Sequence, residues 1–109
     1  MSNTDKLTEA LIKFRDERDW EQFHNPKDLA IALSLEASEL LEAFLWKLPH
    51  EANIQQIKEE LADVLAYALL IAKHYNFNVD DIVMEKIAQN ALKYPTDKAK
   101  GNATKYTDL

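Results

Sequence analysis

The chain has 109 residues, 47% of them apolar, and its 13 basic and 19 acidic side chains leave a net charge of −6. These values are typical of one soluble globular domain, and the acidic balance argues against nucleic-acid polymers as partners, because their phosphates require basic side chains. With one glycine, Gly101, and no cysteine, the sequence excludes glycine-rich phosphate loops, thiolate metal sites and disulfides. A helical protein remains.

The sequence carries no recognisable targeting or membrane signal. No apolar leader follows Met1, so we expect no signal peptide. The longest uncharged apolar run, Val64–Ala72, is only about half as long as a membrane span requires. The absence of cysteine suits a reducing compartment, and we therefore expect a cytoplasmic protein that does not enter a membrane.

The first half of the chain predicts two helices. Apolar residues recur at helical spacing over about residues 5–18, and Asn3 or Thr4 is available as the N-cap. Residues 19–24 break this period and are predicted to be a connector. The dipeptide Asn25–Pro26 is a strong start signal, so a second helix is predicted from there to about Lys47.

The second half predicts two further helices within the same domain, which spans residues 1–109. The third helix covers about Glu51–His74, and its segment 64–72 is apolar on every side, so we expect that segment to be buried in a bundle or a dimer. Asn78 is the predicted cap of a fourth helix that runs to about Lys93. Residues 95–109 are predicted to form an irregular tail.

Two pairs of acids lie on the second and third predicted helices: Glu36 with Glu39, and Glu60 with Asp63. Residues three apart share a helix face, and here the neighbours on that face are apolar. If the two helices form an antiparallel hairpin that turns at Pro49–His50, Glu36 lies opposite Asp63 and Glu39 lies opposite Glu60. All four carboxylates then converge about 15 Å from the turn.

Four carboxylates in an apolar setting repel one another and are costly to desolvate, so a cation must compensate. A set of oxygen ligands without His or Cys suits Mg²⁺, with Mn²⁺ as a second possibility. The alternative is that the acids are structural, in a helical interaction module without catalytic activity. A di-iron bundle is disfavoured because the required Glu-x-x-His motif occurs once, at Glu21–His24, in the connector.

Aromatic residues occur near the acids. Trp46 follows Glu39 by two helical turns, Tyr67 follows Asp63 by one turn, and Trp20 lies in the connector. Such rings beside a metal-bound phosphate would hold a planar ligand by stacking, although each ring can equally be a core residue. Three histidines share no spacing typical of a metal site and are expected at caps or on the surface: His24, His50 and His74.

With these residues in view, the sequence resembles the MazG-like all-α nucleotide pyrophosphohydrolases. The family motif, E-E-x-x-E followed by E-x-x-D, is matched by Leu35–Glu39 and Glu60–Asp63, with leucine in place of the first acid. The resemblance covers about residues 10–109 and is closer to the dCTP pyrophosphatase branch. The segments that carry this closer resemblance are Arg18–His24, Phe44–Lys47, Asn90 with Lys93–Pro95, and Lys105–Leu109.

This resemblance implies a four-helix bundle assembled as a homodimer or homotetramer, with sites partly built from neighbouring subunits. It also implies Mg²⁺-dependent hydrolysis of a nucleoside triphosphate to the monophosphate and pyrophosphate, in housecleaning of the nucleotide pool. The implied substrate is dCTP or a modified dCTP, with another dNTP as the alternative.

The resemblance further implies the roles of individual residues. The implied metal ligands are Glu36, Glu39, Glu60 and Asp63. Either Glu36 or Glu39, if not fully engaged by metal, would act catalytically by orienting the attacking water. The implied substrate-binding residues are Trp20, Trp46, Tyr67, Asn90 and Lys93, with the tail lysines Lys98, Lys100 and Lys105 near the phosphates. No role of the first motif acid transfers to Leu35.

Overall fold

Five α-helices and no strands make up the computed structural model of this protein, which describes residues 1–109. The all-α class expected from the sequence is therefore confirmed. The chain divides into two compact units, residues 1–77 and residues 78–109, and each is described by itself. The first unit contains α1 (Asn3–Glu17), α2 (Pro26–Glu42) and α3 (Ile54–His74). The second contains α4 (Val79–Lys93) and the short α5 (Thr96–Ala99).

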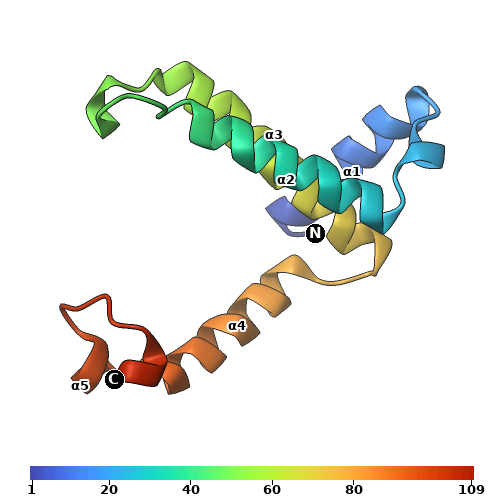
Figure 1. The fold of residues 1–109 in the computed structure, drawn as a ribbon. Coiled ribbons are helices and arrows are strands. Elements are labelled where there is room, and N and C mark those ends of the chain that lie inside the picture. Colours follow the sequence, from blue (N-terminus) through green and yellow to red (C-terminus); the bar gives the residue numbers. More distant parts are fainter. The chain divides into compact units, whose positions relative to one another are not determined.

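The first unit is organised around the pair α2 and α3, which lie side by side in opposite directions, with α1 against α3 (Figure 1). The segment 64–72 of α3 was expected to be buried on every side. Within it only Leu70 and Ala72 are buried, and Leu65 remains 55% exposed. Within one copy of the chain the segment is therefore only partly buried, because α1 and α2 cover only part of the circumference of α3, and its burial in a dimer stays a prediction.

Asparagine side chains begin three of the helices. The Asn25 side chain accepts a hydrogen bond from the Asp28 N–H at 2.9 Å, and Pro26 occupies the first turn, as predicted for α2. Asn78 likewise accepts from the Asp81 N–H at 3.0 Å at the start of α4, which confirms that cap. Asn53 caps α3, so this helix begins three residues later than predicted.

Two other predicted boundaries are corrected. The N-cap of α1 is Ser2, whose hydroxyl accepts from the Asp5 N–H at 3.1 Å, and not Asn3 or Thr4. The residues that precede α3 form a separate 3₁₀ turn, η2 (Pro49–Glu51). Proline fits the first position of such a turn, because its missing N–H has no partner to lose.

The predicted end of α2 at Lys47 is wrong, because the helix ends at Glu42. After that point the Phe44 and Leu45 N–H groups donate to carbonyls three residues back, at 3.0 and 3.1 Å. Trp46 then adopts a left-handed conformation with φ +61°, which no helix tolerates. The chain therefore forms tighter turns after Glu42 and leaves the axis of α2 five residues before the predicted end.

The end of α3 is a Schellman motif, in which a left-handed residue closes the helix with two backbone hydrogen bonds. Asn76 takes φ +56°, its N–H donates to the Lys73 carbonyl at 3.1 Å, and the Phe77 N–H donates to the Ala72 carbonyl at 2.9 Å. Asparagine is the residue that occupies this position most readily after glycine. This motif accounts for the sharp end of the helix.

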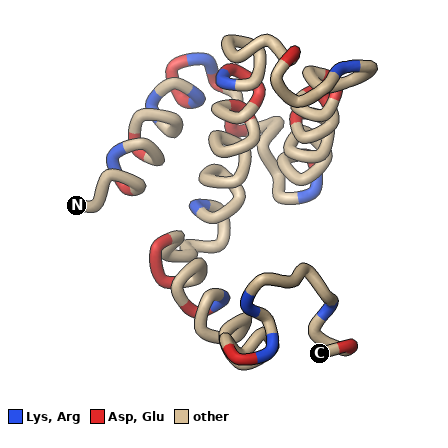
Figure 2. The backbone as a smooth tube through the Cα atoms, turned by 90° about the vertical axis from the view of Figure 1, so that its left-hand side faces the viewer, with Lys and Arg blue, Asp and Glu red and all other residues tan.

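The tail after α4 is more ordered than predicted. It contains α5 and a 3₁₀ turn, η3 (Tyr106–Asp108), and the Tyr94 and Tyr106 rings pack edge to face with centroids 5.9 Å apart. Basic and acidic residues are interspersed along α1 (Figure 2). None of the helices combines the length and the apolar character that crossing a bilayer requires.

Candidate active site

The acid pairs predicted from the sequence come together between α2 and α3. Glu36, Glu60 and Asp63 each offer a carboxylate oxygen, and these oxygens lie within 4.8 Å of one another. Glu39, one turn beyond Glu36 on α2, is exposed and lies outside this tight group, but its charge acts on both Glu36 and Glu60. We call these four residues the acidic cluster.

The acidic cluster is electrostatically unbalanced in the protein alone. One oxygen of Glu36 and one of Glu60 are buried without a hydrogen-bond partner. Burial raises the pKa of Glu36 to about 7, and hydrogen bonding to Glu39 and Glu60 and the charges of Glu39 and Asp63 add to the rise. Burial, followed by hydrogen bonding to Glu39, likewise raises the pKa of Glu60.

The donor set of the acidic cluster fits a hard divalent cation. All the ligand atoms are carboxylate oxygens, which Mg²⁺ and Mn²⁺ prefer. Arg15 pairs with Asp16 and Glu21, and no Lys or Arg forms an ion pair with a carboxylate of the cluster. Because buried carboxylates without a compensating charge are unfavourable, two orphaned oxygens are what a cation site without its cation should display.

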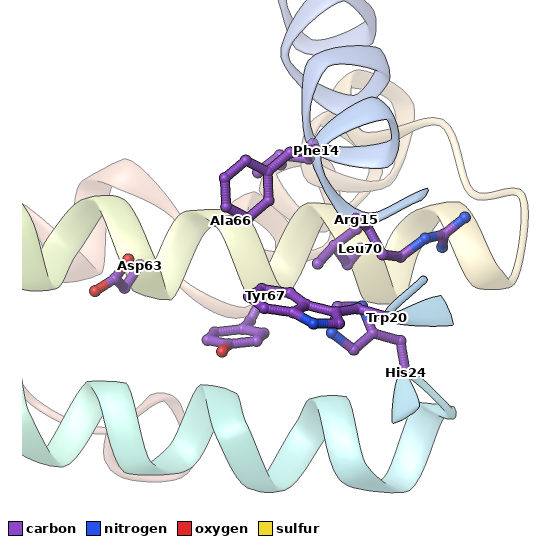
Figure 3. A pocket seen from close by; sticks show the side chains of 9 residues that line it. Phe14, Arg15, Trp20, His24, Asp63, Ala66, Tyr67 and Leu70 are labelled. Carbon is purple, nitrogen blue, oxygen red and sulfur yellow. The ribbon is translucent and has the colours of Figure 1, made fainter. Parts of the chain in front are cut away.

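A pocket of about 300 Å³ opens beside the acidic cluster. We call it the aromatic pocket, and it is lined by Leu11, Phe14, Arg15, Trp20, His24, Asp63, Ala66, Tyr67 and Leu70. Asp63 lies at one end and His24 at the other, with the rings of Tyr67 and Trp20 between them (Figure 3). Asp63 therefore belongs to both the pocket and the cluster.

Tyr67 reaches the aromatic pocket because it follows Asp63 by one turn of α3, on the same face. Burial raises the pKa of its hydroxyl, and the negative charges of Glu36, Asp63 and Glu39 raise it further. The hydroxyl therefore stays protonated and remains a hydrogen-bond donor next to the acids.

Trp20 is placed in the aromatic pocket by a second Schellman motif, at the end of α1. Asp19 takes φ +53°, its N–H donates to the Asp16 carbonyl at 3.1 Å, and the Trp20 N–H donates to the Arg15 carbonyl at 3.0 Å. The Trp20 ring then packs edge to face on Phe14, with centroids 5.7 Å apart. This is the apolar contact that commonly accompanies the motif.

His24 was expected at a cap or on the surface, and it is the C-cap of a 3₁₀ turn, but its place in the aromatic pocket was not predicted. It follows the 3₁₀ turn η1 (Glu21–Phe23), lines the aromatic pocket, and has a buried Nδ1 with no hydrogen-bond partner. Burial lowers its pKa, and the positive charge of Arg15 lowers it further. The sequence signal for a place in the pocket was the position of His24, four residues after Trp20 and directly before Asn25, the N-cap of α2.

The remaining predicted residues are not among those that line the aromatic pocket of the first unit. Trp46 lies in the connection between α2 and α3 and is 94% exposed. Asn90 and Lys93 belong to α4, in the second unit, where the Lys93 Nζ lies 5.0 Å from the Tyr106 ring centroid. The tail lysines Lys98, Lys100 and Lys105 lie in that unit as well.

Comparison with known proteins identifies a family and several similar pyrophosphatases. Residues 31–109 match the MazG-like family. The chain is 40% identical over 105 residues to dCTP pyrophosphatase 1 of Mus musculus and 38% identical to that of Homo sapiens. Each alignment covers 89% of this chain but 62% of the relative, so the chain spans about three-fifths of the length of these relatives.

A solved structure is similar along most of its length. The crystal structure of a pyrophosphatase from Archaeoglobus fulgidus superposes with a TM-score of 0.81 at 35% sequence identity. The match covers 87% of this chain and 94% of that one.

Proposed function

The chain belongs to the MazG-like family, and from this premise we propose that it hydrolyses a nucleoside triphosphate to the monophosphate and pyrophosphate. The observation that carries the proposal is the shared residue Asp63, which joins a four-carboxylate cluster to a pocket walled by Trp20 and Tyr67. A nucleotide has the matching two ends, a polyphosphate that binds metal and a planar base that stacks on rings.

The acidic cluster holds the metal in this proposal, with Glu36, Glu60 and Asp63 as the central ligands and Glu39 beside them. When bound, Mg²⁺ or Mn²⁺ would act as a Lewis acid that neutralises phosphate charge and makes the α-phosphorus more open to in-line attack by water. Of the two carboxylates considered for orienting the attacking water, Glu39 is better suited than Glu36. It is exposed and outside the tight group, so its oxygens are available to accept a proton.

The aromatic pocket receives the base and sugar. The Trp20 ring stacks on the base. The Tyr67 hydroxyl acts as a hydrogen-bond donor on the side of the pocket next to the acidic cluster, and His24 contributes a polar atom at the opposite end of the pocket. The remainder of the wall is apolar, with Leu11, Phe14, Ala66 and Leu70. Together with the activity named for the relatives, this favours dCTP or a modified dCTP as the substrate, in housecleaning of the nucleotide pool.

We further propose that Trp46, Asn90 and Lys93 join the site in a cytoplasmic homodimer or homotetramer. Trp46 is available for this because almost all of its surface is exposed. Exposed apolar side chains along α4, such as Ile87 at 55% and Leu92 at 86%, are of the kind that assembly covers. Lys93 and the tail lysines would then meet phosphate oxygens.

The deciding experiment is a screen for pyrophosphate release over all dNTPs and NTPs with Mg²⁺. We expect the highest turnover with dCTP or a modified dCTP, and loss of turnover in Glu39→Gln. Glu42→Gln is the matched control, because Glu42 is an exposed acid one turn further along α2 and outside the cluster.

The outcomes separate the alternatives. Equal turnover of several dNTPs would keep the chemistry and change the substrate. Release of orthophosphate would contradict attack at the α-phosphorus. Absence of turnover, together with melting that Mg²⁺ does not alter, would indicate a helical interaction module with structural acids.

A further inference from the structure

Phe14 and Trp20 contact each other in the aromatic pocket, although neither ring is buried. The two rings meet edge to face with centroids 5.7 Å apart, and both line the pocket (Figure 3). Phe14 is 49% exposed and Trp20 is 43% exposed. A side chain that is half exposed gains less from packing and can rotate into water at a lower cost. Contacts other than burial are therefore needed to hold the pair in one orientation.

The guanidinium of Arg18 covers the Phe14 ring. Its central carbon lies 3.7 Å from the ring centroid, well inside the distance of about 6 Å at which a cation is attracted to an aromatic face. Arg18 is exposed and has acids on both sides of it in the sequence, Glu17 and Asp19. Its side chain nevertheless lies on the ring. The Phe14 ring therefore contacts both Arg18 and Trp20.

A hydrogen bond fixes the Arg18 side chain in this position. The Arg18 backbone N–H donates to the Arg15 carbonyl at 3.2 Å, and not to the carbonyl four residues back that an α-helix uses. That carbonyl belongs to Phe14, and the Arg18 Nη1 donates to it at 3.0 Å. Arginine near the end of a helix commonly hydrogen-bonds the last carbonyls in this way. The same side chain therefore completes the end of α1 and covers the Phe14 ring.

Arg18 is placed to act on the aromatic pocket through Phe14 and not by contact with a ligand. The residues that line the pocket include Phe14 and Trp20 but not Arg18. Without Arg18, the Phe14 ring would lose the group that lies over its face, and Trp20 would lose a fixed neighbour. Trp20 would then populate more orientations in the free protein. Ordering its ring when a base binds would cost more affinity.

We infer that Arg18 is a positioning residue of the aromatic pocket: it holds the Phe14 ring, and the Phe14 ring holds Trp20 in the orientation that stacks on a base. This inference rests on the proposed function for its ligand, a nucleoside triphosphate. It concerns substrate affinity and not the chemical step, because none of these three residues belongs to the acidic cluster.

The first test needs no activity and no ligand. The full-length protein is labelled with 5-fluorotryptophan, and the ¹⁹F resonances of its two tryptophans are assigned with Trp46→Phe. We expect Arg18→Gln to shift or broaden the Trp20 resonance, because the ring loses its fixed neighbour. Lys13→Gln is the matched control, since it removes the same charge from an exposed position of α1, and it should leave the resonance unchanged. An unchanged Trp20 resonance in Arg18→Gln overturns the inference.

The second test measures KM and kcat for dCTP with Mg²⁺ in the same variants. Arg18→Gln should raise KM by about two- to fivefold, the factor expected for an exposed contact between a cation and a ring, and should change kcat little. Lys13→Gln should change neither constant. A loss confined to kcat in Arg18→Gln overturns the inference.

A double-mutant cycle tests whether Arg18 acts through Phe14. In a Phe14→Leu background, Arg18→Gln should not raise KM further, because the ring on which Arg18 acts is absent. A full additional rise in that background overturns the inference, since Arg18 would then contact the ligand itself. Thermal melts establish that the variants are folded. If no nucleotide is hydrolysed, the proposed function fails, and the ¹⁹F resonance of Trp20 still decides whether Arg18 positions this ring.

Discussion

Glu36 of α2 and Glu60 of α3 meet across the helix pair, and each keeps one buried carboxylate oxygen without a hydrogen-bond partner. Their oxygens belong to a group that also contains Asp63 and spans no more than 4.8 Å. Either a proton or a metal cation between these carboxylates removes their repulsion, so protons and metal ions compete for the same oxygens. The stability of the protein should therefore depend on pH and on metal together.

The pH dependence of the metal-free protein has a definite sign. The pKa of Glu36 is about 7 in the folded chain and 4.5 ordinarily, so between these values the folded state binds more protons than the unfolded state. Stability therefore falls as pH rises through this window and levels off above it. Because Glu36→Gln cannot titrate, its thermal melts should lack this component of the slope.

Mg²⁺ should reverse this loss of stability at rising pH. It should raise the melting temperature most above about pH 7, where the carboxylates of the acidic cluster are ionised, and least near pH 5. Thermal melts across this range with and without Mg²⁺ measure both effects. Identical slopes in the wild type and Glu36→Gln, or a shift with Mg²⁺ that does not depend on pH, would contradict the arrangement.

Asp63→Asn should separate function from stability. Because even ligand-orienting neighbours of a metal contribute about 10- to 100-fold, loss of a ligand should lower pyrophosphate release by at least about 100-fold. The metal-free variant should melt no lower than the wild type, since the change removes one of the repelling charges. Calorimetry with Mg²⁺ should detect weaker binding. Turnover near the wild-type value would refute the assignment of the cluster.

Trp20→Ala should act on substrate affinity. Stacking of a base on an aromatic side chain contributes about 1–3 kcal/mol, so KM should rise by about 5- to 150-fold. Trp20→Phe keeps a ring in the pocket and should recover most of this loss. Steady-state kinetics with dCTP measure the effect, and a thermal melt controls for the lost contact with Phe14. A change confined to kcat would argue against a stacking role.

Asn76 offers a test of the fold alone, far in sequence from the acids. At φ +56° an alanine should destabilise the protein by about 1 kcal/mol, whereas glycine should not destabilise it. In a unit of this size such a loss corresponds to about 4–8 °C in melting temperature. Equal melting temperatures for Asn76→Ala and Asn76→Gly would show that the Schellman motif contributes little.

The acidic cluster was predictable because the sequence signals that place its residues are short-range and follow the helical repeat. The spacing of three within each acid pair fixes a helix face, and a hairpin turn near Pro49 sets which residues face each other. The starts of α2 and α4 were predictable for a similar reason, since an asparagine side chain caps the helix at its own position. Such signals lie within a few residues of the feature they produce.

The aromatic pocket was less predictable because it depends on how helices end. Trp20 reaches the pocket because Asp19 adopts a left-handed conformation, and nothing in the residue type demands this of an aspartate. His24 lies just after the same turn, and it was expected at a cap or on the surface and not in a pocket. The early end of α2 likewise depends on the left-handed Trp46, so that part of the site was predicted on a helix that does not extend so far.

The Schellman motif at Asp19 separates the two parts of the proposed site. The carboxylates stand on the paired helices α2 and α3, whereas Trp20 and His24 stand on a short turn that precedes them. Exchange of residues 18–25 between relatives should therefore alter one side of the pocket and leave the carboxylates of the acidic cluster in place. The side of the pocket that α3 supplies, with Tyr67 and Leu70, would stay unchanged in such an exchange.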